Sequence, residues 1–395
     1  MTTTRYRALD VLRGLAIIGT LGTNIWIFTN PEGFPGYLNA PVVPDVPAVW
    51  AAIATVLQTL AQGKFLGLLT LMFGIGLALQ RRSTLRRGLP WPGRYPWRAG
   101  LLLLDGVLHY LLVIEFDVLM GYAVTGVVVA FLLATSERAQ RTWMIITGGV
   151  HLVVITGLTA LLMATPGLGS GSGSLAVNPY ADGSWWDLVQ LRIDNLAVFR
   201  FEPVLITCYS IFMFLLGATL LSRGVLDREG APLRRRLMII GAAGFVVDFT
   251  IQTFGGAAGV LFGRYITAAL VSIGLLAAVT ELILRQPQVG WSSTRLERIG
   301  RMALSCYVLQ NVLASILCYG WGFGLAAKLP AAWWVPGTMI IFVVVVAGIT
   351  VFADLWQRRF SRGPIEWAWS WCYERVNALL GPVPSQGRER DQVRV

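Results

Sequence analysis

The chain has 395 residues, of which 55% are hydrophobic and 13% are charged, and its formal net charge is +11. A soluble domain carries about 25% charged residues, so this composition excludes an ordinary soluble enzyme. The basic residues lie in short segments between long apolar stretches, which is typical of membrane topology rather than of nucleic-acid binding. Four scattered cysteines and two histidines offer neither a disulfide framework nor a multi-histidine metal site. We therefore expect an integral membrane protein with no metal and no nucleic-acid partner.

Apolar stretches recur along the chain, and a helix needs about 20 apolar residues to cross a bilayer. The segments that fit this pattern are 8–28, 53–79, 97–116, 118–135, 143–163, 200–222, 235–255, 260–284, 301–323 and 333–356. They predict an all-α, polytopic bundle of about ten transmembrane helices. We expect one domain over residues 1–380 and a polar, disordered tail over 381–395. The first apolar stretch contains Asp10 and Arg13 and has no small-residue cleavage site, so we expect no cleaved signal peptide.

The distribution of positive charge predicts the orientation. Of the 32 Lys and Arg residues, 26 fall at the termini and in one set of connecting segments. The opposite set holds only Arg192, Arg200, Arg264 and Lys328. Because cytoplasmic segments carry the excess of positive charge, we expect both termini in the cytoplasm and a location in the cell (inner or plasma) membrane. The outer segment 165–199 is rich in Gly and Ser and then aromatic, and this pattern fits either a lid over an outer cavity or a flexible connector.

The stretch DGVLHYLLVIEFDVLMGYAVTG, residues 105–126, places an ionisable cluster in apolar sequence. Asp105 and His109 are spaced i, i+4 and so share one helix face, where a carboxylate can fix the tautomer of the imidazole. Glu115 and Asp117 follow at the predicted outer turn. The alternative is a buried imidazole that only bonds a neighbouring helix. Because ionisable groups inside a membrane are costly and mark functional sites, we favour a functional His109.

Other polar residues fall inside the predicted spans. Asn24 lies near the outer end of the first span, and Tyr307 and Gln310 are spaced i, i+3 on the ninth. We expect Lys64 to extend towards the outer interface. Three arginines stand at helix ends directed into the bundle and are candidates to hold the phosphates of a donor: Arg13, Arg98 and Arg301. Topology alone accounts for the other cytoplasmic arginines.

Three stretches carry a resemblance to a known family: RALDVLRGLAIIGTLGTNIWIF, GVLHYLLVIEFDVLMGYAVTG, and LERIGRMALSCYVLQNVL with FSRGPIEWAW. In this order they resemble the YeiB-like bacterial membrane proteins, whose C-terminal part, about residues 220–380 here, is domain of unknown function 418. That family is similar to the lysosomal heparan-α-glucosaminide N-acetyltransferases and, more remotely, to the acyltransferase type 3 proteins. The resemblance implies a helical bundle that passes an acyl group from cytosolic acyl-CoA, with acetyl-CoA favoured, to a sugar or lipid hydroxyl or amine on the far side.

The resemblance also implies roles for single residues. Asn24 matches the asparagine that closes the first-helix motif and belongs to the active site of the glucosaminide enzymes. The histidine that follows there has no counterpart in IWIFTNPEGFPGYL. The YeiB-like pattern offers His109 and Asp117 instead, whereas Asp105 is not part of it. We therefore predict that His109 is the base or the acyl carrier and that Asp105 or Asp117 orients it. The residues expected around substrate and oxyanion are Asn24, Gln310, Tyr307 and Glu115.

Two other classes of function stay open. A transporter or lipid exporter would use the same cluster as a proton relay or substrate site. Helices broken by Gly or Pro in both halves would favour transport, and the sequence suggests no matched pair. A membrane scaffold or sensor would tolerate replacement of every intramembrane polar group. The acceptor, the acyl chain and the oligomeric state, a homodimer included, are not fixed by the sequence.

Overall fold

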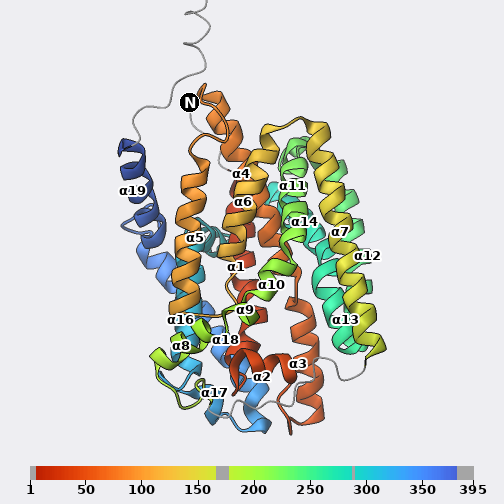
Figure 1. Ribbon diagram of the computed structural model, residues 1–395, viewed down its shortest axis with the longest axis vertical. Coiled ribbons are helices and arrows are strands. Elements are labelled where there is room, and N and C mark those ends of the chain that lie inside the picture. Colours follow the sequence, from red (N-terminus) through yellow and green to blue (C-terminus); the bar gives the residue numbers. More distant parts are fainter. Residues whose placement is uncertain (1–5, 166–177, 287–289, 380–395) are drawn as a thin grey trace, which may run out of the picture.

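The computed structural model describes residues 6–165, 178–286 and 290–379, in which all regular elements are helices (Figure 1). The predicted tail 381–395 lies outside these ranges. The first elements are α1 (Arg7–Phe28), α2 (Gly33–Asn39), α3 (Ala48–Ala61), α4 (Lys64–Arg86), α5 (Tyr95–Leu112), α6 (Leu119–Ala134), α7 (Glu137–Ala164), α8 (Trp185–Asp194), α9 (Leu196–Phe199), α10 (Phe201–Leu205) and α11 (Thr207–Ser222). The remaining elements are η1 (Arg228–Gly230), α12 (Ala231–Phe254), α13 (Gly256–Phe262), η2 (Gly263–Thr267), α14 (Ala268–Arg285), α15 (Trp291–Arg301), α16 (Ala303–Cys318), α17 (Leu325–Lys328), η3 (Ala331–Trp333), α18 (Trp334–Trp356) and α19 (Pro364–Leu379).

The structure confirms an all-α polytopic protein. Among the described residues, six helical stretches are long and apolar enough to cross a membrane: Arg7–Phe28, Ala48–Arg86, Glu137–Ala164, Arg228–Phe254, Gly256–Arg285 and Ala331–Trp356. The pair α15 and α16, bent by 93°, makes up to seven if it is one span. Helices α6 and α11 are apolar but shorter. Each of the ten predicted segments contains a helix, and the number of crossings stays a prediction.

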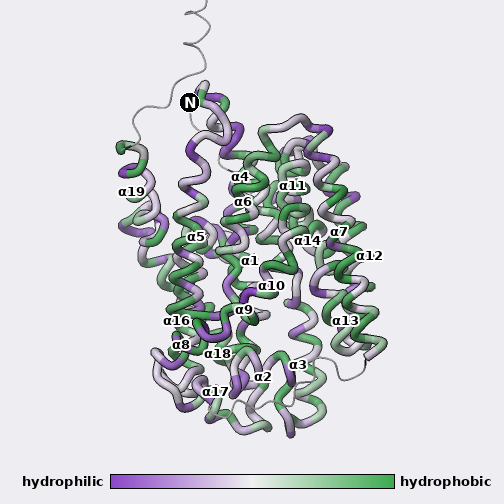
Figure 2. Tube along the Cα trace, in the orientation of Figure 1, coloured by the Kyte–Doolittle hydropathy of each residue, from purple (hydrophilic) through white to green (hydrophobic). Residues whose placement is uncertain are grey.

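The helices divide into central and peripheral ones. In α1, 67% of the apolar stretch is buried inside the protein, against 17% in α7 and 22% in the stretch that contains α12. Figure 1 shows α1 in the middle of the bundle and α7 and α12 along one side. Figure 2 shows hydrophobic residues along α7 and α12 and hydrophilic residues gathered near the end marked N. The apolar surface of α7 and α12 is therefore the part that faces lipid.

A break between α3 and α4 explains where Lys64 goes. Gly63 has φ +78°, which favours glycine, and a Cβ there would lie 2.4 Å from the carbonyl oxygen of Arg264. The Lys64 ammonium is buried rather than extended to the interface, so our expectation for it was wrong. It forms an ion pair with Asp248 and donates to the carbonyl of Thr59 (2.5 Å). The broken helix leaves carbonyls at the end of α3 unsatisfied, and they attract the cation.

Candidate active site

The turn between α5 and α6 brings a histidine and a carboxylate together. His109 lies in the last turn of α5, and Asp117 precedes the start of α6. Asp117 Oδ2 accepts hydrogen bonds from the backbone N–H groups of Leu119 (2.9 Å) and Met120 (3.2 Å). The carboxylate thus caps the N-terminus of α6, where negative charge is favoured. Its other oxygen, Oδ1, lies 2.8 Å from His109 Nδ1, and both side chains are almost completely buried.

This pairing selects one tautomer of His109. A carboxylate that already accepts two backbone hydrogen bonds also acts as the acceptor for Nδ1, which therefore carries a proton. Nε2 then carries the lone pair of the ring and accepts a hydrogen bond from Asn311 Nδ2 at 3.3 Å. An imidazole held in this way can take up a proton at Nε2. Asn311 directly follows the predicted Gln310, but only the three-dimensional contact reveals that it reaches His109.

Helix α16 supplies the other neighbours of the imidazole. The ring of Tyr307 packs on His109, with ring centroids 5.1 Å apart. Gln310 is fully buried, and neither Oε1 nor Nε2 of its amide has a hydrogen-bond partner among the described residues. A buried amide without partners is costly, which leaves Gln310 with unused hydrogen-bonding capacity one turn from Tyr307.

Asp105 does not take the role that its spacing suggested. It lies on α5 one turn before His109, but Nδ1 of the imidazole turns towards Asp117 instead. Asp105 is half-buried, and its Oδ2 has no hydrogen-bond partner in the part of the chain that the structure describes. The capped carboxylate of Asp117 is fixed by the start of α6, so it is the better-positioned partner. Of the two carboxylates we considered, Asp117 is the one that orients the histidine.

Arg200 holds the α5–α6 turn from outside the two helices. Its guanidinium donates to the carbonyl oxygens of Asp117 (3.1 Å) and Glu115. It also lies over the ring of Tyr110, 4.0 Å from the centroid, a cation–π geometry. The sequence marked Arg200 only as one of the few cations on the arginine-poor side. That scarcity was the available signal, since an isolated cation near apolar helices needs specific partners.

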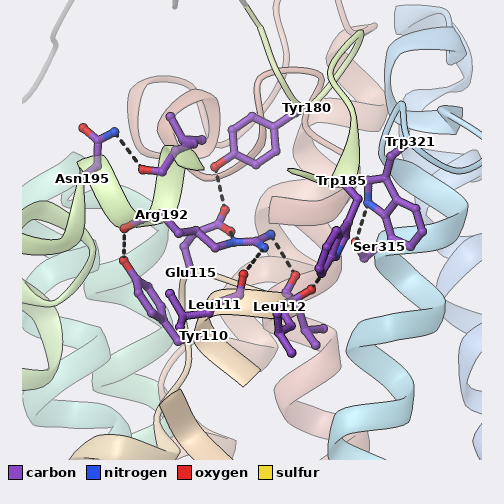
Figure 3. A network of polar contacts seen from close by, with 12 residues as sticks. Tyr110, Leu111, Leu112, Glu115, Tyr180, Trp185, Arg192, Asn195, Ser315 and Trp321 are labelled. Carbon is purple, nitrogen blue, oxygen red and sulfur yellow. Dashed lines mark hydrogen bonds and ion pairs between the residues drawn. The ribbon is translucent and has the colours of Figure 1, made fainter. Parts of the chain in front are cut away.

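Glu115, which we predicted near the substrate, belongs to a different network (Figure 3). Its carboxylate pairs with Arg192 Nε (3.3 Å) and accepts a hydrogen bond from the Tyr180 hydroxyl (2.8 Å). Arg192 also donates to the carbonyls of Leu111 (3.0 Å) and Val113 (2.9 Å) at the end of α5. Burial and the nearby Glu115 carboxylate raise the pKa of Tyr180 well above its usual value, so its hydroxyl remains a donor. Glu115 lines neither cavity described below, and its contacts are structural.

The described part of the outer segment is folded onto α5. Trp185 Nε1 donates to the carbonyl of Leu112 (2.8 Å), and the Tyr110 hydroxyl donates to the carbonyl of Arg192 (2.5 Å) (Figure 3). Residues 178–199 are therefore neither a flexible connector nor an open lid but a strap that covers the end of α5. Residues 166–177 of the predicted lid lie outside the described ranges.

A large cavity lies on the arginine-poor side of this turn. Its volume is about 1130 Å³, and its lining includes Asn24, Asp117, Arg200 and Tyr307. Glu202 and Arg264, joined by a 2.7 Å ion pair, are also in its wall. A volume of this size exceeds the roughly 300–1,000 Å³ of ordinary ligand pockets. We call this space the outer cavity.

A smaller cavity, the inner cavity, has a volume of about 330 Å³ and lies towards the arginine-rich side. It is lined by all three arginines that we predicted for a donor: Arg13, Arg98 and Arg301. Each of them already has a neighbour, since Arg13 pairs with Asp10, Arg301 with Glu297, and Arg98 lies over the ring of Tyr373. Glu366 also lines this cavity and accepts the backbone N–H of Leu304 (2.9 Å) at the start of α16.

Tyr307 lines both cavities. His109 lines neither of them; of its contacts, Asp117 and Tyr307 line the outer one and Asn311 lines neither. Asn24 belongs to the outer cavity, and Gln310 to neither. The structure therefore brings His109, Asp117 and Tyr307 into one cluster, places Asn24 across the cavity wall, and leaves Asp105 and Glu115 outside.

Comparison with known sequences relates the chain to two bacterial proteins. Residues 220–375 match the family described as protein of unknown function (DUF418). The chain is 26% identical to the uncharacterized protein YxaH of Bacillus subtilis (strain 168) over 390 residues, covering 93% of this chain and 94% of the relative. It is 29% identical to the uncharacterized protein YeiB of Escherichia coli (strain K12) over 394 residues, covering 91% and 94%. This chain thus contains a DUF418 region and is similar over almost its whole length to YeiB and YxaH. Within the DUF418 match lie α16 with Tyr307 and the inner-cavity residue Arg301, whereas His109 and Asp117 lie before it.

Proposed function

We propose that this DUF418 protein transfers an acyl group from cytosolic acyl-CoA, with acetyl-CoA favoured, to a hydroxyl or amine on the opposite side of the membrane. The observation that carries the proposal is that two cavities towards opposite ends of the bundle share Tyr307, whose ring packs on the His109–Asp117 pair. Donor and acceptor could meet at this residue. A proton acceptor would stand directly behind it.

The inner cavity supports the donor half of the proposal. Three arginines provide charge for phosphate groups, and the excess of positive residues assigns this side to the cytoplasm. A volume of about 330 Å³ is at the lower end for ligand pockets, so it would hold the thioester arm of a CoA while the nucleotide stays at the arginine-rich surface. Glu366 in the same wall would limit how many anionic groups enter.

The transfer step assigns a role to each member of the cluster. The acceptor hydroxyl replaces the Asn311 amide at His109 Nε2 after the Tyr307 ring moves aside; Nε2 takes its proton, and the oxygen attacks the thioester carbonyl. The C–S bond breaks, and the leaving thiolate receives the proton from the imidazolium, which Asp117 stabilises. Tyr307 and Asn24 face the cavities as donors for the oxyanion, and one such donor is worth about 3 kcal/mol.

A transporter is the second candidate, because the helices are broken in both halves of the chain. α3 and α4 are separated at Gln62 and Gly63, and α15 and α16 bend by 93°. Breaks in corresponding halves are a feature of transporters. Transport would move a substrate between the two cavities without chemistry, so it predicts no release of CoA thiol.

The test is release of free thiol from acetyl-CoA by the purified protein in the presence of a membrane-lipid and glycan extract. We expect His109→Ala to lower the rate by about 10²–10⁴-fold, the usual contribution of a general base. The matched control is His151→Ala at the other buried histidine, whose one hydrogen-bond partner among the described residues is the carbonyl of Tyr265 (3.0 Å). Melting curves of both variants report folding. Thiol release by a folded His109→Ala protein at the wild-type rate would exclude this mechanism.

A further inference from the structure

The outer cavity is polar at one end and apolar at the other. Its inner wall carries Asn24, Arg200 and Glu202, close to the α5–α6 turn. At the opposite end the lining includes Leu162 and Met163 at the C-terminus of α7 and Val260 on α13. Met163 is exposed. A cavity with this division fits a molecule that has a polar head and an apolar remainder.

The apolar end lies beside helices that face lipid. α7 is the least buried of the spans, and α13, which begins the next span Gly256–Arg285, packs against α7 and α12. In Figure 1, α7 and α13 end before the level reached by α2 and α17. The residues here are small, with Gly255, Gly256 and Ala257 all exposed. The small side chains at this edge leave space next to the lipid-facing surface of α7.

The charges at the polar end indicate the kind of headgroup. The basic residues of the lining, Arg200 and Arg264, are matched by the acidic residues Asp117 and Glu202. Arg264 is occupied by Glu202 at 2.7 Å, and Arg200 by the backbone carbonyls of the α5–α6 turn. Such a wall carries no net charge for a phosphate. It instead offers amide and hydroxyl groups, including Thr20, Asn24 and Gln58, which suit an uncharged, hydroxyl-bearing head.

We infer that the outer cavity binds the uncharged sugar headgroup of a membrane glycolipid, which enters sideways beside the adjoining ends of α7 and α13 and leaves its chains in the bilayer. The inference names the acceptor class for the acyl transfer proposed above, and to that extent it rests on that function. A free sugar would gain nothing from the apolar end of the cavity, whereas a lipid chain there stays in contact with apolar surface.

The test is binding of a monoglucosyl diacylglycerol, compared with glucose, to the full chain in phosphatidylcholine nanodiscs, measured by native mass spectrometry. Ala258→Trp fills the entrance on α13, and Leu162→Trp fills it from α7. Ala243→Trp is the control, because Ala243 is exposed on α12 and does not line the cavity. We expect glycolipid adducts in the wild type and the control, a loss of at least about tenfold in each entrance variant that folds, and no glucose adduct.

Glycolipid binding that is equal in the wild type and the folded entrance variants would overturn the inference, as would glucose binding as strong as glycolipid binding. The assay contains no acyl donor, so the proposed reaction is tested separately by CoA thiol release. Thiol release without entrance-dependent glycolipid binding refutes the lipid route and leaves acyl transfer standing. Entrance-dependent glycolipid binding by a protein that never consumes acetyl-CoA supports the lipid site and refutes the transferase.

Discussion

Asp117 both caps the start of α6 and orients His109, because one carboxylate oxygen accepts backbone N–H groups while the other lies 2.8 Å from His109 Nδ1. The position of the histidine ring is therefore fixed by the same interaction that fixes the start of a helix. A small side-chain change at Asp117 should alter proton transfer without removing the helix cap.

Asp117→Asn tests this link. The amide oxygen can still accept the N–H of Leu119, and the amide nitrogen then donates to His109 Nδ1 and moves the ring proton to Nε2. We expect the acyl-transfer rate to fall by about 10²–10⁴-fold with little change in melting temperature. Asp105→Asn distinguishes the two carboxylates, and we expect a much smaller effect because Asp105 does not contact the ring. Equal losses in both variants would contradict the assignment.

The inner cavity predicts a specific pattern of CoA binding. Arg301 lines the cavity, whereas Arg295, on the same helix and also paired with a carboxylate, does not. Loss of a charged hydrogen bond costs about 1.5–3 kcal/mol, so Arg301→Ala should weaken CoA binding by roughly 10–100-fold. Isothermal titration with CoA measures this, and Arg295→Ala is the matched control. A uniform, small loss in both would mean that only the general positive charge of this face matters.

The Glu115–Arg192 pair predicts a stability effect. Both side chains are almost fully buried, and removing one partner of such a pair costs about 3–5 kcal/mol because the other charge stays buried. We expect Arg192→Met to destabilise the protein by this amount, and Glu115→Gln combined with Arg192→Met to recover part of it. Thermal or denaturant unfolding of the two single variants and the double variant gives the coupling. Additive effects would contradict a direct pair.

Helix α8 should respond to acid at its first turn. Hydrogen bonds from the hydroxyl and backbone N–H of Ser184 lower the pKa of Asp187. Because the folded pKa lies below the unfolded one, the stabilisation is fully present above the ordinary Asp pKa of about 3.9 and is lost as the pH falls through the folded pKa. Hydrogen exchange of residues 185–194, corrected for intrinsic rates, should show constant protection between about pH 8 and pH 5. The protection should decrease in more acidic buffer. Ser184→Ala should remove this pH dependence.

Hydropathy and charge were sufficient to predict the helical segments and to single out three arginines that share the inner cavity, because both follow from local sequence. Spacing alone could not choose between Asp105 and Asp117, since that choice depends on how the chain turns after α5. The network of Glu115 could not be predicted because its partner Arg192 is distant in sequence. Lys64 was misplaced because the break at Gly63 creates a site for its ammonium that an unbroken helix would not contain.

The strap over α5 also has a consequence for how the protein is made. The turn that carries His109 is held by Arg192 and Arg200, which emerge from the ribosome roughly 80 residues later. Before Arg192 and Arg200 are synthesised, Glu115 lacks these cationic partners. We therefore expect the hairpin of α5 and α6 to stay in the insertion machinery or at the bilayer surface until then. Chains arrested shortly before residue 192 should therefore be recognised by membrane quality-control proteases, whereas chains arrested after residue 200 should resist them.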